Sequence, residues 1–186
     1  WEMRESFQFG RLVDNSRLSG AVLVEDQYYI SGGGQSSPDD NFVYVLNLNG
    51  ELLESYAQVA NSRYGIRDMA WDDEIIWGAD EDRIYGFTTE GDSVTSFMVN
   101  DNYDQAIAWD SDRELLWICG KLSRYIVGYN REGVAVDSVD QSNLMVYGLA
   151  FHSVDHDGFP LYVSHYIVVA NGPDYQALHK INPETN

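Results

Sequence analysis

Few basic side chains, few prolines and a single cysteine are the first features of this 186-residue sequence. Eleven Lys and Arg residues stand against 30 Asp and Glu residues, so the formal net charge is -19. A surface this negative repels phosphate backbones, and no basic patch with interleaved aromatic residues interrupts it, so we expect no nucleic-acid partner. Cys119, the one cysteine, cannot form an intrachain disulfide, and its apolar neighbours predict a buried, inert thiol.

Long apolar runs are also missing. The longest candidate, residues 166–170, has the length of a strand, whereas a membrane helix needs about 20 apolar residues, so we expect no membrane span. No signal peptide is visible and the chain starts at Trp1, so we interpret it as a mature or trimmed product of a secreted, cell-surface or periplasmic protein. The acidic surface then has three explanations: solubility in a salty or extracellular setting, which we prefer, affinity for divalent cations, or a cationic partner.

What the sequence does contain is many aromatic residues and an internal repeat. Thirteen Tyr and five Trp residues suit the half-buried, pleated surface of a β-sheet. An apolar residue, Ala and an aromatic residue follow one another three times, with the aromatic residue at Trp71, Trp109 and Phe151. These positions are 38 and 42 residues apart, and a period of about 40 residues is typical of propeller blades.

Each copy of this pattern begins a set of predicted strands. A polar turn leads to a second strand, and a third strand ends at Gly50, Gly91 or Gly133, where Asn or Glu precedes the glycine of a tight hairpin. A fourth strand follows each of these glycines, and a degenerate first copy starts at Ser19. We therefore predict one all-β domain over residues 1–186, a β-propeller of four four-stranded antiparallel blades: 19–59, 65–99, 105–139, and 147–182 plus 1–9.

The two ends of the chain bear on how the ring closes. The last copy lacks a fourth strand, while Ser6 and Phe7 near the start match Ser55 and Tyr56 of the first fourth strand. We predict that the N-terminal strand closes the last blade, because closure removes the sheet edges that would otherwise recruit other chains. Two alternatives stay open: the chain forms half of an eight-bladed ring of two chains, or it is a fragment of a longer propeller.

The repeat reads G-x-A-(W/F)-D, then L-W, then I-x-x-(Y/F) and a turn glycine, and it covers nearly the whole chain. It resembles the bacterial propellers of the six-bladed NHL and lactonase type and of the five-bladed glutamine cyclotransferase type. Because such blades occur in enzymes, lectins and scaffolds, the resemblance implies a fold and not an activity. A lactonase-type propeller would hold a divalent ion on its axis, yet of the nearest positions here only Asp68 is a strong ligand; the others are Gly20, Gln105 and Gly148.

In a propeller, the loops that enter the innermost strands and the loops that follow the second strands share one face around the axis. We predict that this axial face binds the ligand. Tyr64 lies in one of these loops, and Arg67 with Asp68 interrupts an otherwise small, apolar strand start, as an ion pair or as a polar ligand contact. The candidate residues are Arg17, Arg67, Asp68, Tyr103, Asp104, Tyr147, Lys121 and His165.

A calcium ion is the one cofactor that the sequence suggests. The run from Asp155 through Asp157 to Gly158 resembles an oxygen-rich calcium loop, although it also fits an enlarged turn. Calcium needs about six or more oxygen ligands, of which Asp155 and Asp157 are the candidates. No G-x-S-x-G elbow and no recognisable catalytic triad supports a nucleophile.

These observations predict a non-catalytic propeller domain that binds a protein, glycan or peptide, as a monomer or as a two-chain ring. The alternative is a metal-dependent hydrolase of the lactonase type. A third interpretation is a purely structural module that pairs with other chains through its strand edges.

Overall fold

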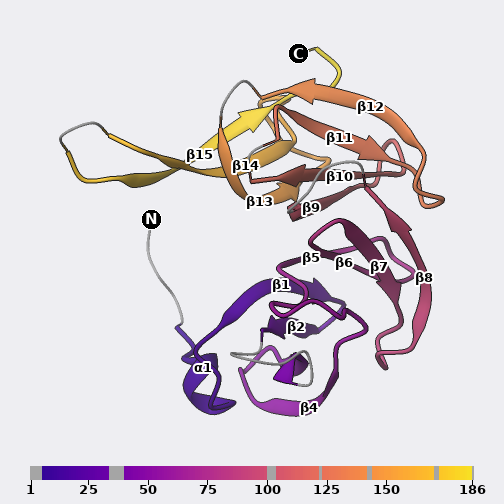
Figure 1. Cartoon of the computed structure of the whole chain (residues 1–186), viewed down its shortest axis with the longest axis vertical. Coiled ribbons are helices and arrows are strands. Elements are labelled where there is room, and N and C mark those ends of the chain that lie inside the picture. Colours follow the sequence, from indigo (N-terminus) through magenta and orange to yellow (C-terminus); the bar gives the residue numbers. More distant parts are fainter. Residues whose placement is uncertain are drawn as a thin grey trace.

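The computed structural model describes residues 6–33, 40–99, 104–121, 123–141, 144–169 and 172–185. Within these ranges the chain forms antiparallel sheets and one four-residue helix, and the sheets are arranged around a common axis as the four blades of a β-propeller (Figure 1). The predicted all-β propeller fold is confirmed. No helix in the described part of the chain has the length and apolar character needed to cross a membrane.

Each sheet follows chain order from the innermost to the outermost strand. The first contains β1 (Leu18–Val24), β2 (Gln27–Gly32), β3 (Phe42–Asn47) and β4 (Leu52–Ala57). The second contains β5 (Asp68–Trp71), β6 (Ile76–Asp80), β7 (Arg83–Phe87) and β8 (Ser93–Met98). The third contains β9 (Asp104–Asp110), β10 (Leu115–Gly120), β11 (Tyr125–Tyr129) and β12 (Ala135–Asp140), and the fourth contains β13 (Met145–Phe151), β14 (Leu161–Ile167) and β15 (Tyr175–Ile181).

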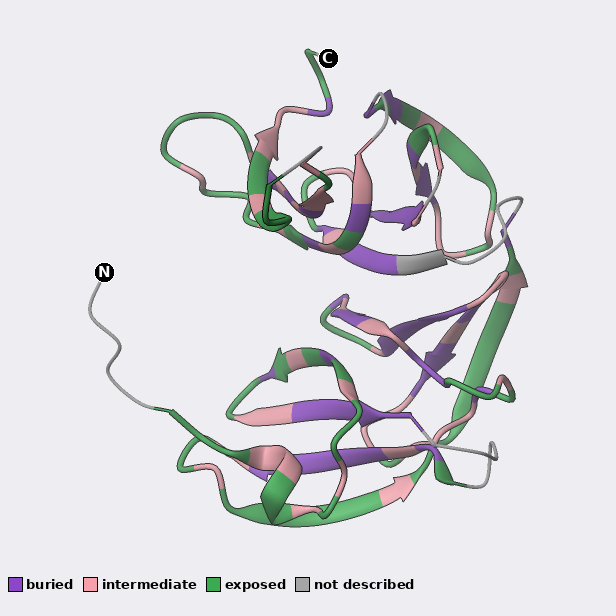
Figure 2. Ribbon diagram, turned by 60° about the vertical axis from the view of Figure 1, so that its left-hand side comes forward, coloured by how far each residue is buried: buried purple, intermediate pink, exposed green. Residues whose placement is uncertain are grey.

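The core consists of layers between neighbouring sheets. The innermost strands lie side by side in the order β1, β5, β9 and β13. One apolar cluster joins the first sheet to the second, another the second to the third, and another the third to the fourth. Figure 2 shows the consequence: the middle strands β2, β3, β6 and β10 are largely buried, whereas the outer strands β4, β8 and β12 are largely exposed.

An aspartate at the end of the innermost strand fixes the first turn of the second and third sheets. Asp72 accepts two turn N–H groups at 2.9 and 2.8 Å and the indole N–H of Trp77 at 2.8 Å. Asp110 does the same with two turn N–H groups at 3.1 Å and with Trp117 at 3.0 Å. Trp77 and Trp117 are 1% and 0% exposed, so their indole N–H groups need an acceptor within the protein. Each pair joins a turn to the core of its blade.

The prediction that an N-terminal strand closes the last blade is wrong for the residues that the structure describes. Ser6–Gln8 form no strand, α1 (Phe9–Leu12) is helical, and the sheet β13–β14–β15 contains three strands. The physical reason is burial: Phe9 and Val13 pack on an apolar cluster around Ile30 on the outer face of the first sheet. Residues 1–5 of the predicted strand lie outside the described residues.

Candidate functional site

A small basic pocket lies on the axial face between the first and second sheets. Its volume is about 180 Å³. Arg17 and the start of β1 form one side, and the connection from β4 to β5 forms the other. Its lining residues are Arg17, Leu18, Ser19, Gly33, Tyr64 and Arg67. The structure thus brings together Arg17 and Arg67, two of the predicted site residues that are 50 positions apart in the sequence.

The ring of Tyr64 lies close to two guanidinium groups. The guanidinium of Arg67 lies 4.8 Å from the centroid of the Tyr64 ring, and that of Arg63 lies 5.5 Å away. The Tyr64 side chain is 43% exposed. Arg67 makes no ion pair with any of the described residues. Its stacked and partly exposed guanidinium therefore keeps donors for an incoming acceptor.

The loop that carries Tyr64 and Arg67 is held in place by hydrogen bonds to Asp80 at the end of β6. The buried carboxylate of Asp80 accepts the Ser62 N–H at 3.1 Å and also the Ser62 hydroxyl. The Ser62 oxygen in turn accepts the N–H groups of Tyr64 and Gly65 at 3.2 and 3.0 Å. Because these bonds fix the loop before any ligand arrives, binding costs little additional ordering of the chain.

Gly33 allows the first sheet to approach this loop. A Cβ atom at position 33 would lie 2.4 Å from the carbonyl oxygen of Tyr64, which is far inside contact distance. The Gly33 N–H donates to the carbonyl of Arg17 at 3.0 Å. The glycine therefore sets the narrow spacing between the two halves of the pocket.

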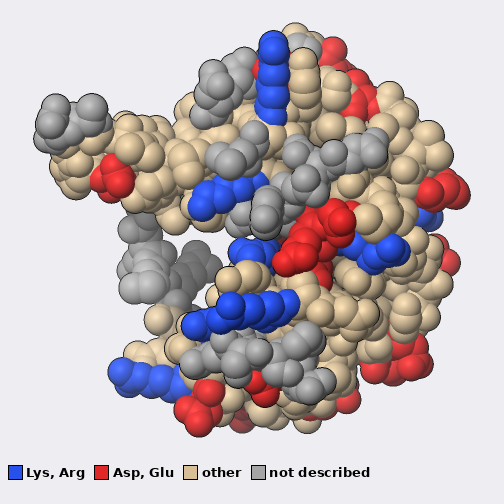
Figure 3. Space-filling view, viewed as in Figure 1, with Lys and Arg blue, Asp and Glu red and all other residues tan. Residues whose placement is uncertain are grey.

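A second cation–aromatic contact lies on the same face, between the third and fourth sheets. Lys121 follows β10, and its ammonium lies 4.9 Å from the centroid of the Tyr147 ring on β13. Tyr147 is 39% exposed and packs edge-on against Tyr166 at 6.3 Å. Two more predicted site residues, Lys121 and Tyr147, are thus brought together. Figure 3 shows Lys and Arg side chains around the middle of one face, with acidic side chains among them and around the rim.

The opposite face carries negative charge. A pocket of about 620 Å³ between the first and second sheets is lined by turn residues and by five carboxylates: Glu25, Asp26, Glu54, Asp73 and Glu90. Burial and the charges of Glu54, Glu90 and Glu25 raise the pKa of Tyr29, which lines the same pocket. The two pockets between the first and second sheets therefore differ in charge: the lining of the axial pocket includes Arg17 and Arg67, whereas the opposite pocket is lined by carboxylates.

Asp68 does not line the basic pocket. Its carboxylate accepts the backbone N–H of Ile107 on β9 at 3.1 Å and that of Leu149 on β13 at 3.4 Å, besides its neighbour Met69 at 3.0 Å. Burial raises the pKa of Asp68 to about 7, although these hydrogen bonds oppose the increase. Arg67 and Asp68 thus have different surroundings: the arginine lines a surface pocket, and the aspartate joins the innermost strands.

The remaining axial candidates are placed as follows. His165 is 2% exposed, lies 4.4 Å from the ring of His179, and has a pKa lowered by burial and by that neighbour. It is buried toward the third sheet and does not line the pocket. Asp104 begins β9, and its side chain is outside what the structure describes. Tyr103 lies outside the described residues.

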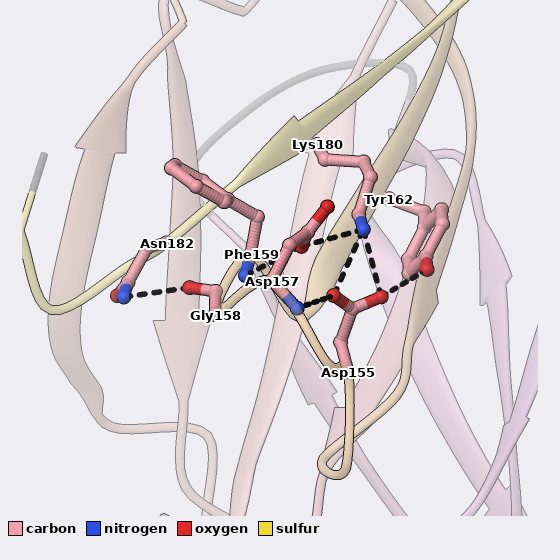
Figure 4. A network of polar contacts seen from close by, with 7 residues as sticks. All are labelled: Asp155, Asp157, Gly158, Phe159, Tyr162, Lys180 and Asn182. Carbon is pink, nitrogen blue, oxygen red and sulfur yellow. Dashed lines mark hydrogen bonds and ion pairs between the residues drawn. The ribbon is translucent and has the colours of Figure 1, made fainter.

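The proposed calcium ligands surround an ammonium group instead (Figure 4). Lys180 Nζ lies 2.8 Å from Asp155 and 2.7 Å from Asp157, and the Tyr162 hydroxyl donates to Asp155. Hydrogen bonds involving Asp157, Lys180 and Tyr162 hold the pKa of Asp155 well below its usual range. Among the described residues, no three His, Cys, Asp or Glu side chains are grouped so that they could hold a metal ion. Lys180 supplies the positive charge that a cation would otherwise bring.

Comparison with known proteins identifies the fold and not the ligand. No family model and no curated protein matches the sequence. Among solved structures, the chain is similar to the WD40 domain of Neurospora crassa Pan2, with a TM-score of 0.61 and 9% identity over 91% of this chain and 47% of that one. The chain spans about half the length of this neighbour. The similarity shows the β-propeller fold alone, and it does not confirm the resemblance to lactonase-type or glutamine cyclotransferase-type propellers.

Proposed function

We propose that this protein is a non-catalytic, protein-binding scaffold whose axial pocket receives an acidic segment of its partner. Propellers of the WD40 type are typically protein-interaction scaffolds, and the chain shares that fold. The observation that carries the proposal is Arg67, a cation without an ion pair among the described residues, stacked on Tyr64 in a preformed pocket.

The chemistry of the pocket favours a carboxylate over other ligands. A guanidinium offers several N–H donors in a fixed plane and binds carboxylates through paired, charge-assisted hydrogen bonds. The volume of about 180 Å³ admits a side chain rather than a large cofactor. Tyr64 adds an exposed ring on which the apolar part of the ligand can pack.

The net charge of -19 repels an acidic partner at long range, whereas the arginine of the pocket attracts a carboxylate at short range. Which of the two dominates depends on distance. At physiological salt the Debye length is about 8 Å, which screens most of the distant carboxylates. A guanidinium and a carboxylate in direct contact lie within that length and keep their attraction. We therefore expect local recognition of modest affinity.

Fluorescence anisotropy with a labelled octaglutamate peptide tests the proposal. Arg67→Glu reverses the pocket charge and should weaken binding about tenfold, which corresponds to roughly 1.4 kcal/mol. Tyr64→Ala should weaken it less, because it removes the ring and leaves the guanidinium. Arg11→Glu is the matched control: it makes the same charge change at an exposed position of α1, outside this pocket, and should leave binding within twofold.

Equal affinities for Arg67→Glu and Arg11→Glu would contradict the proposal, since binding would then follow net charge and not the pocket. So would binding of a neutral or lysine-rich peptide with the affinity of octaglutamate. We propose no second function, because no observation on the described residues favours a hydrolase.

A further inference from the structure

One contact recurs where β4 meets the second sheet and where β8 meets the third. The turn between the third and fourth strands of each full sheet holds a glycine with positive φ: Gly50 at 78°, Gly91 at 87° and Gly133 at 79°. A Cβ on Gly91 would lie 2.4 Å from the Tyr56 ring, and one on Gly133 would lie 2.5 Å from the Phe97 ring. The outer-strand aromatic residue of one blade therefore lies flat on the turn glycine of the following blade.

Phe7 makes the same contact with the first sheet. A Cβ on Gly50 would lie 2.4 Å from the Phe7 ring. Phe7 also follows Ser6, as Tyr56 follows Ser55 and Phe97 follows Ser96. Phe7 thus stands where the outer-strand aromatic residue of a preceding blade belongs, although Ser6–Gln8 pair with no strand of the described chain.

The fourth sheet lacks an outermost fourth strand in the described chain, because there β15 pairs only with β14. The register defines which residue of β15 is affected. Trp77 pairs with Gly86, Trp117 with Gly128 and Tyr162 with Lys180, so Leu178 corresponds to Ile84 and Ile126, two positions earlier. Ile84 and Ile126 are 0% exposed, whereas Leu178 is 61% exposed.

The outward face of the fourth sheet is uncovered around Leu178. In the second and third sheets the corresponding face is buried by the next blade, so that Trp77 and Trp117 have almost no exposed surface. In the fourth sheet Tyr162 is half-buried and Ala150 is exposed. The outer face of the first sheet is covered by Phe9 and Val13, so the two ends of the chain are not equivalent.

We infer that two copies of the chain join head to tail, with the segment around Phe7 of one copy lying along β15 of the other as its missing fourth strand. In the described chain, the segment Ser6–Gln8 pairs with no strand and the fourth sheet has three strands, so one contact satisfies both. Two such junctions close a ring of eight blades and leave no open end. The helix α1 stays on its own first sheet, so the copy that supplies the strand keeps its fold.

The three complete sheets fix the register of this junction. Ile84 pairs with Phe97 and Tyr85 with Ser96, and Ile126 and Val127 repeat this with β12. By the same register Phe7 of one copy lies opposite Leu178 of the other, and Ser6 lies opposite His179. Residues directly opposite across antiparallel strands have Cβ atoms about 5 Å apart, which a disulfide can bridge with a small adjustment.

Light scattering after gel filtration and disulfide trapping test this inference without reference to any ligand. The chain has a mass of 21.1 kDa, and the expected species has twice that mass. Ser6→Cys and His179→Cys are made in separate chains, and the two variants are mixed under mild oxidation. A cross-linked pair should form in the mixture. The control, Ser6→Cys mixed with Val94→Cys, should not cross-link, because Val94 is exposed on the outer strand of the second sheet.

Three outcomes would overturn the inference. The first is a monomer at every concentration. The second is a dimer in which Ser6→Cys and His179→Cys cross-link no more than the control pair. The third is a chain carrying both substitutions that forms the disulfide within itself and stays monomeric, which would indicate closure of a single-chain ring. Leu178→Lys provides an independent readout: it should dissociate the dimer while the circular dichroism of the sheets is retained.

Discussion

At the scale of single residues, Asp68 is where the four innermost strands converge. Its carboxylate bonds to backbone N–H groups of β9 and β13, and a Cβ on Gly20 of β1 would lie 2.8 Å from the Asp68 Cα. An enclosed carboxylate satisfied by backbone donors stabilises an assembly of strands better than it binds a ligand. We therefore expect Asp68 to stabilise the ring, and Arg67 stays the proposed contact with the ligand.

Asp68 makes the stability of the protein depend on pH near neutrality. Its folded pKa, about 7, lies above the ordinary value of 3.8, so the folded state binds the proton more tightly than the unfolded state. The stability that this proton provides is complete below pH 3.8 and is lost as the pH rises through 7. Between pH 6 and pH 8 the free energy of unfolding should fall by about 1.4 kcal/mol from this group. Urea unfolding at both pH values measures it.

Asp68→Asn is the control, because an amide has nearly the same size and does not titrate in this range. Its free energy of unfolding should change by about 1.4 kcal/mol less than that of the wild type between the same pH values. Parallel pH profiles of the two proteins would show that Asp68 titrates normally in the folded state.

The sequence predicted which residues share the axial face better than it predicted how they are arranged there. Arg17, Arg67, Lys121 and Tyr147 were predicted because their loops share one face, and the structure brings them together as two pairs. The sequence could not show that two guanidinium groups lie close to the Tyr64 ring. That arrangement depends on the hydrogen bond between Ser62 and Asp80, which positions the loop. The same limit applies to Asp155 and Asp157, whose cation comes from Lys180, more than 20 positions later.

At the scale of elements, period and turn chemistry predicted the strands well. The predicted third strands end at Gly50, Gly91 and Gly133, which is three to four residues after β3, β7 and β11 end, because these glycines lie in the turns that follow. Tight glycine turns and alternating burial define such strands locally. The N-terminal segment was harder, because α1 forms only through a tertiary contact of Phe9 and Val13 with the first sheet. A segment of four residues has too little intrinsic helix propensity to be predicted as a helix from the sequence.

Phe9 should therefore hold α1 on the first sheet. Phe9 packs against the cluster around Ile30 and stacks on Phe7 at 5.5 Å. Phe9→Ala should lower the free energy of unfolding by about 2 kcal/mol, because it removes a partly buried ring. Leu12→Ala, in the same helix at a position that is 52% exposed, should cost less than about 0.5 kcal/mol. Chemical denaturation compares the two variants, and equal losses would show that α1 does not depend on this packing.

At the scale of the whole molecule, acidic and basic side chains are unevenly distributed between the two faces. Carboxylates line the pocket at one end of the first and second sheets, whereas Arg17 and Arg67 line the pocket at the other. An acidic surface keeps the protein soluble and disfavours unspecific contacts with other acidic proteins. Against this background, the proposed recognition of a carboxylate is confined to a small basic pocket with an exposed tyrosine. A secreted or surface location stays a prediction from composition.

The central claim is that the axial pocket binds a carboxylate through Arg67, and NMR of the arginine side chains tests it most directly. Octaglutamate is titrated into the protein while the Nε–Hε resonance of each arginine is followed, with Arg67→Lys used to assign the signal. We predict a saturable shift of Arg67 Nε–Hε and little change at Arg83, which donates to Ser96 at 3.0 Å away from the pocket. A titration that shifts other arginines and leaves Arg67 unmoved would contradict the account.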